Sequence, residues 1–99
     1  MIMMGKKSIV YFWAPWCGPC KIFGPIFETV ALEDKSIDFA KVNADEDKAS
    51  VEKYRVRGVP TIIFMDGDTE VHRVSGARGL SLFKADIRTA FGFSHGFTQ

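Results

Sequence analysis

Two cysteines three positions apart, Cys17 and Cys20, form the feature that most restricts what this chain can be. An apolar run from Ile9 to Ala14 comes just before the pair, and a segment with helical spacing follows it. A cysteine pair between a strand and a helix is typical of a redox-active site. The spacing also puts both thiols on one face of the helix, one turn apart, which is close enough for a disulfide.

The residues around the pair suit the first turn of a helix. Backbone N–H groups in that turn have no helical partner, and the helix dipole is positive there. We therefore expect the pKa of Cys17 to lie below the ordinary thiol value of about 8.5. Gly18 lets the backbone of a partner approach closely. Pro19 is tolerated because an N–H at this position would have no helical partner.

The rest of the chain predicts alternating strands and helices. Strands are expected at residues 8–14, 37–43, 61–65 and 70–74, and helices at 17–34, from 45 to 54, and at 80–91. The first two strands should be parallel, with a right-handed crossover, and Asp66-Gly67 should turn a hairpin between the last two. We expect a four-stranded mixed sheet with helices on both faces, an α/β fold. Pro25 should kink the first helix.

Length and composition limit the function. Ninety-nine residues suit one domain, residues 1–99, with an N-terminal extension at 1–7 and a tail at 92–99. The net charge of +1 gives no reason to expect nucleic acid or an anionic membrane as a partner. The apolar runs are too short for a membrane span, and Met1–Met4 does not look like a secretory signal. Two cysteines at redox spacing fit a reducing compartment, so we expect a cytoplasmic protein.

Several separate motifs then point to one family. The segment Trp16-Cys17-Gly18-Pro19-Cys20-Lys21 is identical to the active-site motif of thioredoxins. Further matches, in the same order, are Phe12-Trp13-Ala14, Pro25, Gly58-Val59-Pro60-Thr61 and Val74-x-Gly76-Ala77. Over residues 8–91 the chain therefore resembles the thioredoxin family.

The resemblance is to a short member. Thioredoxins usually carry an extra strand and helix before the first strand seen here, and this chain has only about seven residues there. Residues 37–43 should then form an edge of the sheet. Asp38 and Lys41 would discourage unwanted pairing at that edge, or Met1–Met4 would fold back over part of it.

The resemblance implies a protein-disulfide reductase with Cys17 as the nucleophile and Cys20 as the resolving thiol. The redox group would be the Cys17–Cys20 disulfide itself, with no organic cofactor and no metal. The implied partners are a thioredoxin-reductase-like electron donor and disulfide-containing client proteins, and we expect a monomer. The implied substrate-binding residues are Trp16, Gly18, Pro19, Val59, Pro60 and Gly76.

Four of these substrate-binding residues have distinct expected roles. Trp16 would present a flat apolar surface beside the nucleophile, whereas Trp13 is expected to be structural. The family implies a cis Pro60 facing the cysteines, which would leave the backbone of Val59 free to pair with an extended substrate. A small residue at Gly76 would leave room for a docking partner, although the position also fits an ordinary glycine loop before a helix.

Tyr11 is the main departure from the family. Thioredoxins usually carry there a buried Asp that accepts a proton from the resolving thiol, and Lys41 matches the lysine that pairs with it. Tyrosine, with an ordinary pKa of about 10, is a poor base at neutral pH. One hypothesis is that Cys20 is deprotonated more slowly, or by Lys41 or water. The other is that Tyr11 only fills core volume while another group accepts the proton.

Other functions fit parts of the pattern. A glutaredoxin-like, glutathione-coupled reductase would suit the short N-terminus, and an accessory subunit could carry the thiols incidentally. A zinc site would need more ligands, and only His72 and His95, both expected to be exposed, are candidates. The direction of the reaction depends on the redox potential, because the same dithiol chemistry serves oxidants, reductants and isomerases.

Overall fold

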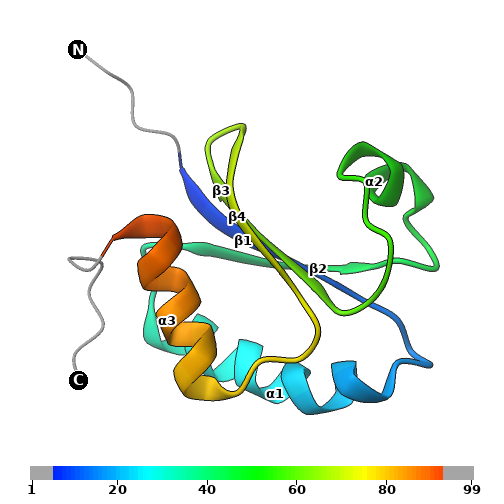
Figure 1. The fold of residues 1–99 in the computed structure, drawn as a ribbon, viewed down its shortest axis with the longest axis horizontal. Coiled ribbons are helices and arrows are strands. Elements are labelled where there is room, and N and C mark those ends of the chain that lie inside the picture. Colours follow the sequence, from blue (N-terminus) through cyan, green and yellow to red (C-terminus); the bar gives the residue numbers. More distant parts are fainter. Residues whose placement is uncertain (1–5, 93–99) are drawn as a thin grey trace.

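The computed structural model describes residues 6–92 (Figure 1). Strands and helices alternate in the predicted order, which ends with a hairpin and a helix. The elements are β1 Lys7–Trp13, α1 Gly18–Glu33, β2 Asp38–Asn43, α2 Lys48–Lys53, β3 Thr61–Asp66, β4 Thr69–Ser75 and α3 Leu80–Phe91. Met1–Met4, His95 and most of the glycine- and phenylalanine-rich tail lie outside the described residues.

The four strands form one mixed sheet in the order β2-β1-β3-β4. Strand β1 runs parallel to β2 and antiparallel to β3, and β3 and β4 form the predicted hairpin. Gly67 in the hairpin turn has a φ of 63°, a backbone conformation that suits glycine. The parallel pairing places Tyr11 of β1 beside Lys41 of β2. The expected sheet topology is therefore confirmed.

Helices cover both faces of the sheet (Figure 1). Helices α1 and α3 lie against one face, where Phe23, Phe27 and Phe83 pack with residues of β1 and β3. The smaller helix α2 lies on the other face, over Phe12 and Ile63. The larger core cluster, under α1 and α3, also contains both cysteines, so the redox pair is part of the hydrophobic core.

Burial explains the different patterns of the strands. Strand β3 is buried from Thr61 to Met65, which is typical of a central strand covered on both faces. Strand β2 is an edge of the sheet, as expected, and its charged residues Asp38 and Lys41 are exposed. Lys6 Nζ lies 3.6 Å from the Asp38 carboxylate at the start of this edge. Charges in these positions oppose pairing with other chains.

Two local predictions about helices had different outcomes. The helix expected from residue 45 begins only at Lys48, because the Asp47 side chain accepts the backbone N–H of Ser50 and caps the helix there. The hydrogen bonds lower the pKa of Asp47. Helix α1 includes Pro25 and extends over 16 residues as one helix. The kink expected at Pro25 remains a prediction.

A partly buried ion pair fastens helix α3 to the loop that precedes it. The carboxylate of Asp86 accepts two hydrogen bonds from the Arg78 guanidinium, at 2.8 and 3.0 Å. His72 of β4, expected to be exposed, has only 27% of its side chain exposed, and its Nε2 lies 3.8 Å from Asp86. This cluster holds the segment between β4 and α3, in which Gly76 lies.

We expect Asp86→Asn to destabilise the fold by about 1–3 kcal/mol, because it leaves the Arg78 guanidinium without a charged partner. The measurement is urea denaturation of wild type and variant. Asp66→Asn is the control, because this carboxylate lies in the hairpin region and takes no part in the Arg78–Asp86 ion pair. Equal stability of Asp86→Asn and wild type would show that the partly buried pair contributes nothing net.

Candidate functional site

The cysteine pair lies where strand β1 passes into helix α1. The backbone N–H of Cys17 donates to the carbonyl of Ala14 at 3.1 Å and closes a turn. Helix α1 then begins at Gly18, with Cys17 as its N-cap and Pro19 in its first turn. Cys17 and Cys20 form a disulfide with their Cα atoms 5.2 Å apart. The predicted pairing of the two thiols is therefore present in the structure.

The cap is made by sulfur. The backbone N–H of Cys20 donates to Cys17 Sγ at 3.2 Å, so Cys17 Sγ receives a helix N–H that would otherwise lack a partner. A negative charge on this sulfur after reduction would be stabilised by the same N–H and by the helix dipole. Both cysteines are nearly buried, with 3% and 4% exposed. The local geometry therefore distinguishes Cys17 from Cys20 more clearly than exposure does.

Trp16 is the most prominent apolar side chain beside the disulfide. It is 70% exposed, as expected for a contact surface, and Gly18 and Pro19, which lie between the two cysteines, are also exposed. The indole Nε1–H donates to both carboxylate oxygens of Asp45, at 3.0 and 3.2 Å. The ring is therefore oriented by a hydrogen bond at one edge while much of its surface stays open.

Asp45 was not identified from the sequence as a site residue. It follows β2, whereas Trp16 follows β1, and these strands are parallel neighbours. The ends of adjacent parallel strands meet at one edge of a sheet, so the residues after them are brought together. The predicted parallel pairing already indicates that the residues after β1 and β2 lie close together. Which of them form a contact depends on the conformation of the two loops.

The peptide bond between Val59 and Pro60 is cis, as the family resemblance implies. Pro60 is buried, and its carbonyl accepts the backbone N–H of Gly76 at 2.9 Å. Val59 packs against the core cluster that contains both cysteines. The loops that carry Val59 and Gly76 are therefore joined to each other by a backbone hydrogen bond.

Gly76 has a φ of 90°, a conformation that side chains rarely adopt. A Cβ at this position would meet no atom of this chain within 4 Å. The backbone conformation is therefore a sufficient reason for glycine here, which supports the simpler of the two interpretations. The open space around Gly76 is also compatible with a docking partner.

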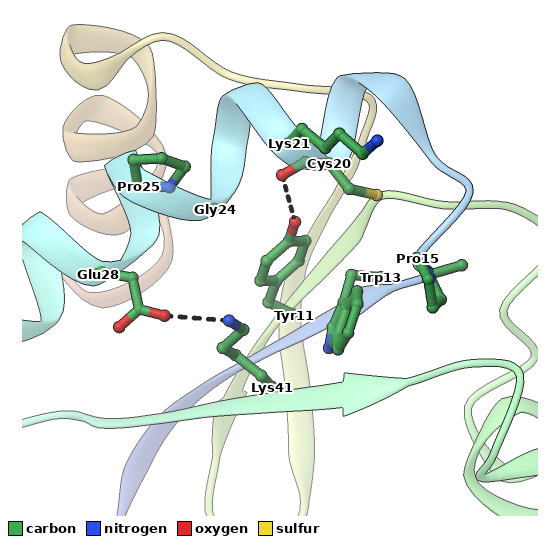
Figure 2. Close-up of a pocket in the computed structure, with 10 residues that line it drawn as sticks. Tyr11, Trp13, Pro15, Cys20, Lys21, Gly24, Pro25, Glu28 and Lys41 are labelled. Atoms are coloured by element: carbon green, nitrogen blue, oxygen red, sulfur yellow. Dashed lines mark hydrogen bonds and ion pairs between the residues drawn. The ribbon is translucent and has the colours of Figure 1, made fainter.

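Tyr11 lies beneath the cysteine pair and is fully enclosed, with 1% exposed. Its ring makes an edge contact with Phe23, centroid to centroid 5.0 Å, and lies 5.1 Å from Phe27. Its hydroxyl donates to the backbone carbonyl of Cys20 at 3.0 Å (Figure 2). Tyr11 thus fills core volume and ties β1 to the first turns of α1.

Burial raises the pKa of Tyr11 to about 12, and the nearby Glu28 carboxylate adds to the effect. The hydroxyl therefore stays protonated at neutral pH and keeps its hydrogen bond to the Cys20 carbonyl. A protonated phenol that donates to a backbone carbonyl cannot accept the proton of a thiol through the same O–H. Tyr11 is thus not the base for Cys20.

Lys41 forms no ion pair with Tyr11, because the protonated phenol carries no charge. Its Nζ lies 3.0 Å from Glu28 Oε2 and 5.5 Å from the centre of the Trp13 ring. Figure 2 shows the Lys41 side chain directed toward Glu28, which comes from helix α1. The partner of Lys41 in this protein is therefore Glu28, a residue not identified from the sequence.

Within residues 6–92, no three His, Cys, Asp or Glu side chains gather as a metal site would require. No helix in this range is both long and apolar enough to cross a membrane. The chemistry that the site can perform is thiol–disulfide exchange at the Cys17–Cys20 pair.

Comparisons with known proteins agree with this chemistry. A family model described as Thioredoxin matches residues 2–89. A thioredoxin of Mycoplasma pneumoniae is 46% identical over 71 residues, which are 72% of this chain and 70% of that protein. A bifunctional thioredoxin reductase/thioredoxin of Mycobacterium leprae is 33% identical over 88% of this chain and 19% of that protein. The X-ray structure of Fasciola hepatica thioredoxin has a TM-score of 0.78 at 38% identity, covering 86% of this chain and 82% of that one.

Proposed function

We propose, from the premise that this chain belongs to the thioredoxin family, that it reduces protein disulfides with Cys17 as the nucleophile and Cys20 as the resolving thiol. Thiol–disulfide oxidoreductase activity follows from family membership together with the redox-active cysteine pair. The redox group is part of the chain, and thioredoxins need no other cofactor. This outcome favours the thioredoxin interpretation over the glutaredoxin-like and accessory-subunit alternatives.

One observation supports the assignment of roles to the two thiols. Cys17 Sγ is the N-cap of α1 and accepts the N–H of Cys20, so a thiolate is favoured at Cys17. A thiolate is the nucleophile in disulfide exchange, and its availability controls the rate. Cys20 lies one turn further along the helix and is the second, resolving thiol.

The reaction proceeds by two exchanges. The Cys17 thiolate attacks one sulfur of a client disulfide, forms a mixed disulfide and releases the other client sulfur as a thiolate, which takes up a proton. Cys20 loses its proton and attacks Cys17 Sγ, which breaks the mixed disulfide and releases the second client thiolate. Two electrons have then moved to the client, and the chain holds the Cys17–Cys20 disulfide seen in the structure.

The docking surface in this proposal consists of exposed and backbone groups around the disulfide. Trp16 supplies an exposed apolar face, and the exposed Gly18 and Pro19 leave room for a client to approach Cys17. The Val59 backbone pairs with an extended client segment. The backbone hydrogen bond from Gly76 to the Pro60 carbonyl supports this arrangement.

Turnover requires a protein that reduces the Cys17–Cys20 disulfide again. The bifunctional Mycobacterium leprae relative is named for both a thioredoxin reductase and a thioredoxin. We accordingly propose a thioredoxin-reductase-like donor for this chain, a reducing compartment such as the cytoplasm, and disulfide-containing proteins as clients. We further propose that residues 1–99 act as a single domain. The redox potential of the Cys17–Cys20 pair in graded thiol buffers decides the direction: a value below the glutathione couple supports a reductant.

Trp16→Ala should lower kcat/KM for a protein disulfide by about tenfold, because an exposed aromatic anchor commonly contributes more than about 1 kcal/mol to an interface. Insulin reduction coupled to an electron donor measures this. Leu32→Ala is the matched control, because Leu32 is also strongly exposed but lies in the last turn of α1. An equal loss in both variants would show that Trp16 has no particular role in docking.

A further inference from the structure

The second exchange needs a proton acceptor, and the structure shows where to look for it. In the mixed disulfide Cys20 carries a thiol, which must lose its proton to become the attacking thiolate. Tyr11 occupies the position beneath this thiol, and its hydroxyl is protonated and donates to the Cys20 carbonyl. The acceptor is therefore another group with access to Cys20.

A cavity of about 440 Å³ lies between β1, β2 and α1 (Figure 2). Its lining residues are Tyr11, Trp13, Ala14, Pro15, Cys20, Lys21, Gly24, Pro25, Glu28 and Lys41. One water takes up about 30 Å³ of liquid, so the cavity has room for several. Cys20 and Glu28 thus line the same space.

Among the described residues that line this cavity, Glu28 is the only one with a carboxylate. The other charged side chains facing it are Lys41 from β2 and Lys21 from α1, and an ammonium group has donors but no acceptor. Lys41 Nζ holds Glu28 Oε2 at 3.0 Å, which fixes the carboxylate beside the cavity. The Glu28 side chain is 59% exposed, so water reaches it.

Two further observations connect Glu28 with the cysteine end of the cavity. Its negative charge reaches the Tyr11 hydroxyl, where it helps to raise the pKa of that group, and the hydroxyl in turn contacts Cys20. Figure 2 shows the Glu28 carboxylate and the Cys20 sulfur on opposite sides of Tyr11. The carboxylate does not touch the sulfur, so a proton must travel between them through water.

We propose that Glu28, positioned by Lys41, accepts the proton of Cys20 through water in this cavity during resolution of the mixed disulfide. The inference rests on the proposed function, because it needs Cys20 as the resolving thiol. The thiol proton passes to water while a proton from that water chain moves to the Glu28 carboxylate. The Cys20 thiolate forms the bond to Cys17 Sγ, the bond from Cys17 to the client sulfur breaks, and Glu28 later returns its proton to solvent.

The test separates the two exchanges in one stopped-flow trace. Reduced protein is mixed with dithiobis(nitrobenzoate), which releases one coloured thiolate when Cys17 attacks and a second when Cys20 resolves the mixed disulfide. Glu28→Gln should leave the first release unchanged and slow the second by about tenfold, below the range of about 10²–10⁴ for a directly placed base, because water competes. Glu28→Asp should recover part of the rate, and Lys41→Met should lose part of it.

The pH profile distinguishes proton transfer from a structural effect. The difference between Glu28→Gln and wild type should shrink as the pH rises, because hydroxide and solvent then deprotonate Cys20 directly. Glu33→Gln is the matched control, since Glu33 lies on the same helix and also pairs with a lysine, Lys84, at 3.0 Å. It should leave both releases unchanged.

The outcomes are distinct for the two proposals. A second release in Glu28→Gln that equals wild type at every pH, or that slows no more than in Glu33→Gln, overturns the role of Glu28 and leaves the proposed function intact. A first release that is as fast in a Cys17→Ser variant as in wild type overturns the proposed function itself. A slower second release with the same slowing at all pH values shows a structural role and also overturns the proton-acceptor role.

Discussion

Cys17→Ser should lower the rate of protein-disulfide reduction by more than about a thousandfold, because the covalent route through a mixed disulfide is lost. A hydroxyl at the N-cap of α1 can still accept the N–H of Cys20, so the helix should begin at the same residue. The measurement is insulin reduction with dithiothreitol as the electron donor, compared with the rate in the absence of protein.

Cys20→Ser should behave differently, and this difference is the sharpest sign of the two roles. It retains Cys17 and should form the mixed disulfide, but it lacks the thiol that resolves it. The complex should accumulate and be visible as a client-linked species under non-reducing electrophoresis. Accumulation in Cys17→Ser instead would reverse the assignment, and accumulation in neither variant would contradict the exchange mechanism.

Both cysteine variants also lose the disulfide, so their stability must be compared with that of the reduced wild-type protein. Urea denaturation under reducing conditions provides this comparison. Similar midpoints for reduced wild type and both variants would assign the activity losses to chemistry rather than to unfolding.

Tyr11→Ala should destabilise the protein by about 3–5 kcal/mol, since it removes an enclosed aromatic ring and leaves a cavity. The ring contacts Phe23 and Phe27 and lies under α1, so its loss opens the centre of the larger core cluster. Such a change is a large part of the stability of about 5–15 kcal/mol typical of a domain. Urea denaturation of the oxidised protein measures it.

Tyr11→Phe is the matched variant, because it keeps the ring and removes only the hydroxyl. It should cost about 1 kcal/mol, the net value of one hydrogen bond, here the bond to the Cys20 carbonyl. Comparable losses in the two variants would mean that the hydrogen bond, rather than the packed ring, accounts for the role of Tyr11 in stability.

The position of Tyr11 also bears on the substitution suggested by the family pattern. Tyr11→Asp would place a carboxylate among Phe23 and Phe27 and would remove the ring that fills this space. Any gain in resolving rate would therefore come with a loss of packing. The Tyr11 ring packs against Phe23 and Phe27 at the position where thioredoxins usually carry an acid, and among the described residues the carboxylate that lines the cavity is Glu28.

Much of the fold was predictable from local patterns. The apolar run before Cys17, the helical spacing after it and the Asp66-Gly67 turn each depend on neighbouring residues, and the structure confirms the elements they predict. The predicted start of α2 was wrong by three residues. Periodicity alone does not show which carboxylate of an acidic run caps the helix. Asp47 caps the helix because its side chain accepts hydrogen bonds from Ser50.

The sequence by itself determined the redox pair and its place at the start of a helix, because Cys17 and Cys20 are joined by one helical turn. Only the tertiary structure decided the surroundings of that pair. The contacts of Trp16 with Asp45, of Tyr11 with the Cys20 carbonyl and of Glu28 with Lys41 join residues 29, 9 and 13 positions apart. Such contacts depend on how strands and helices pack, and no local pattern in the chain specifies which side chains will then meet.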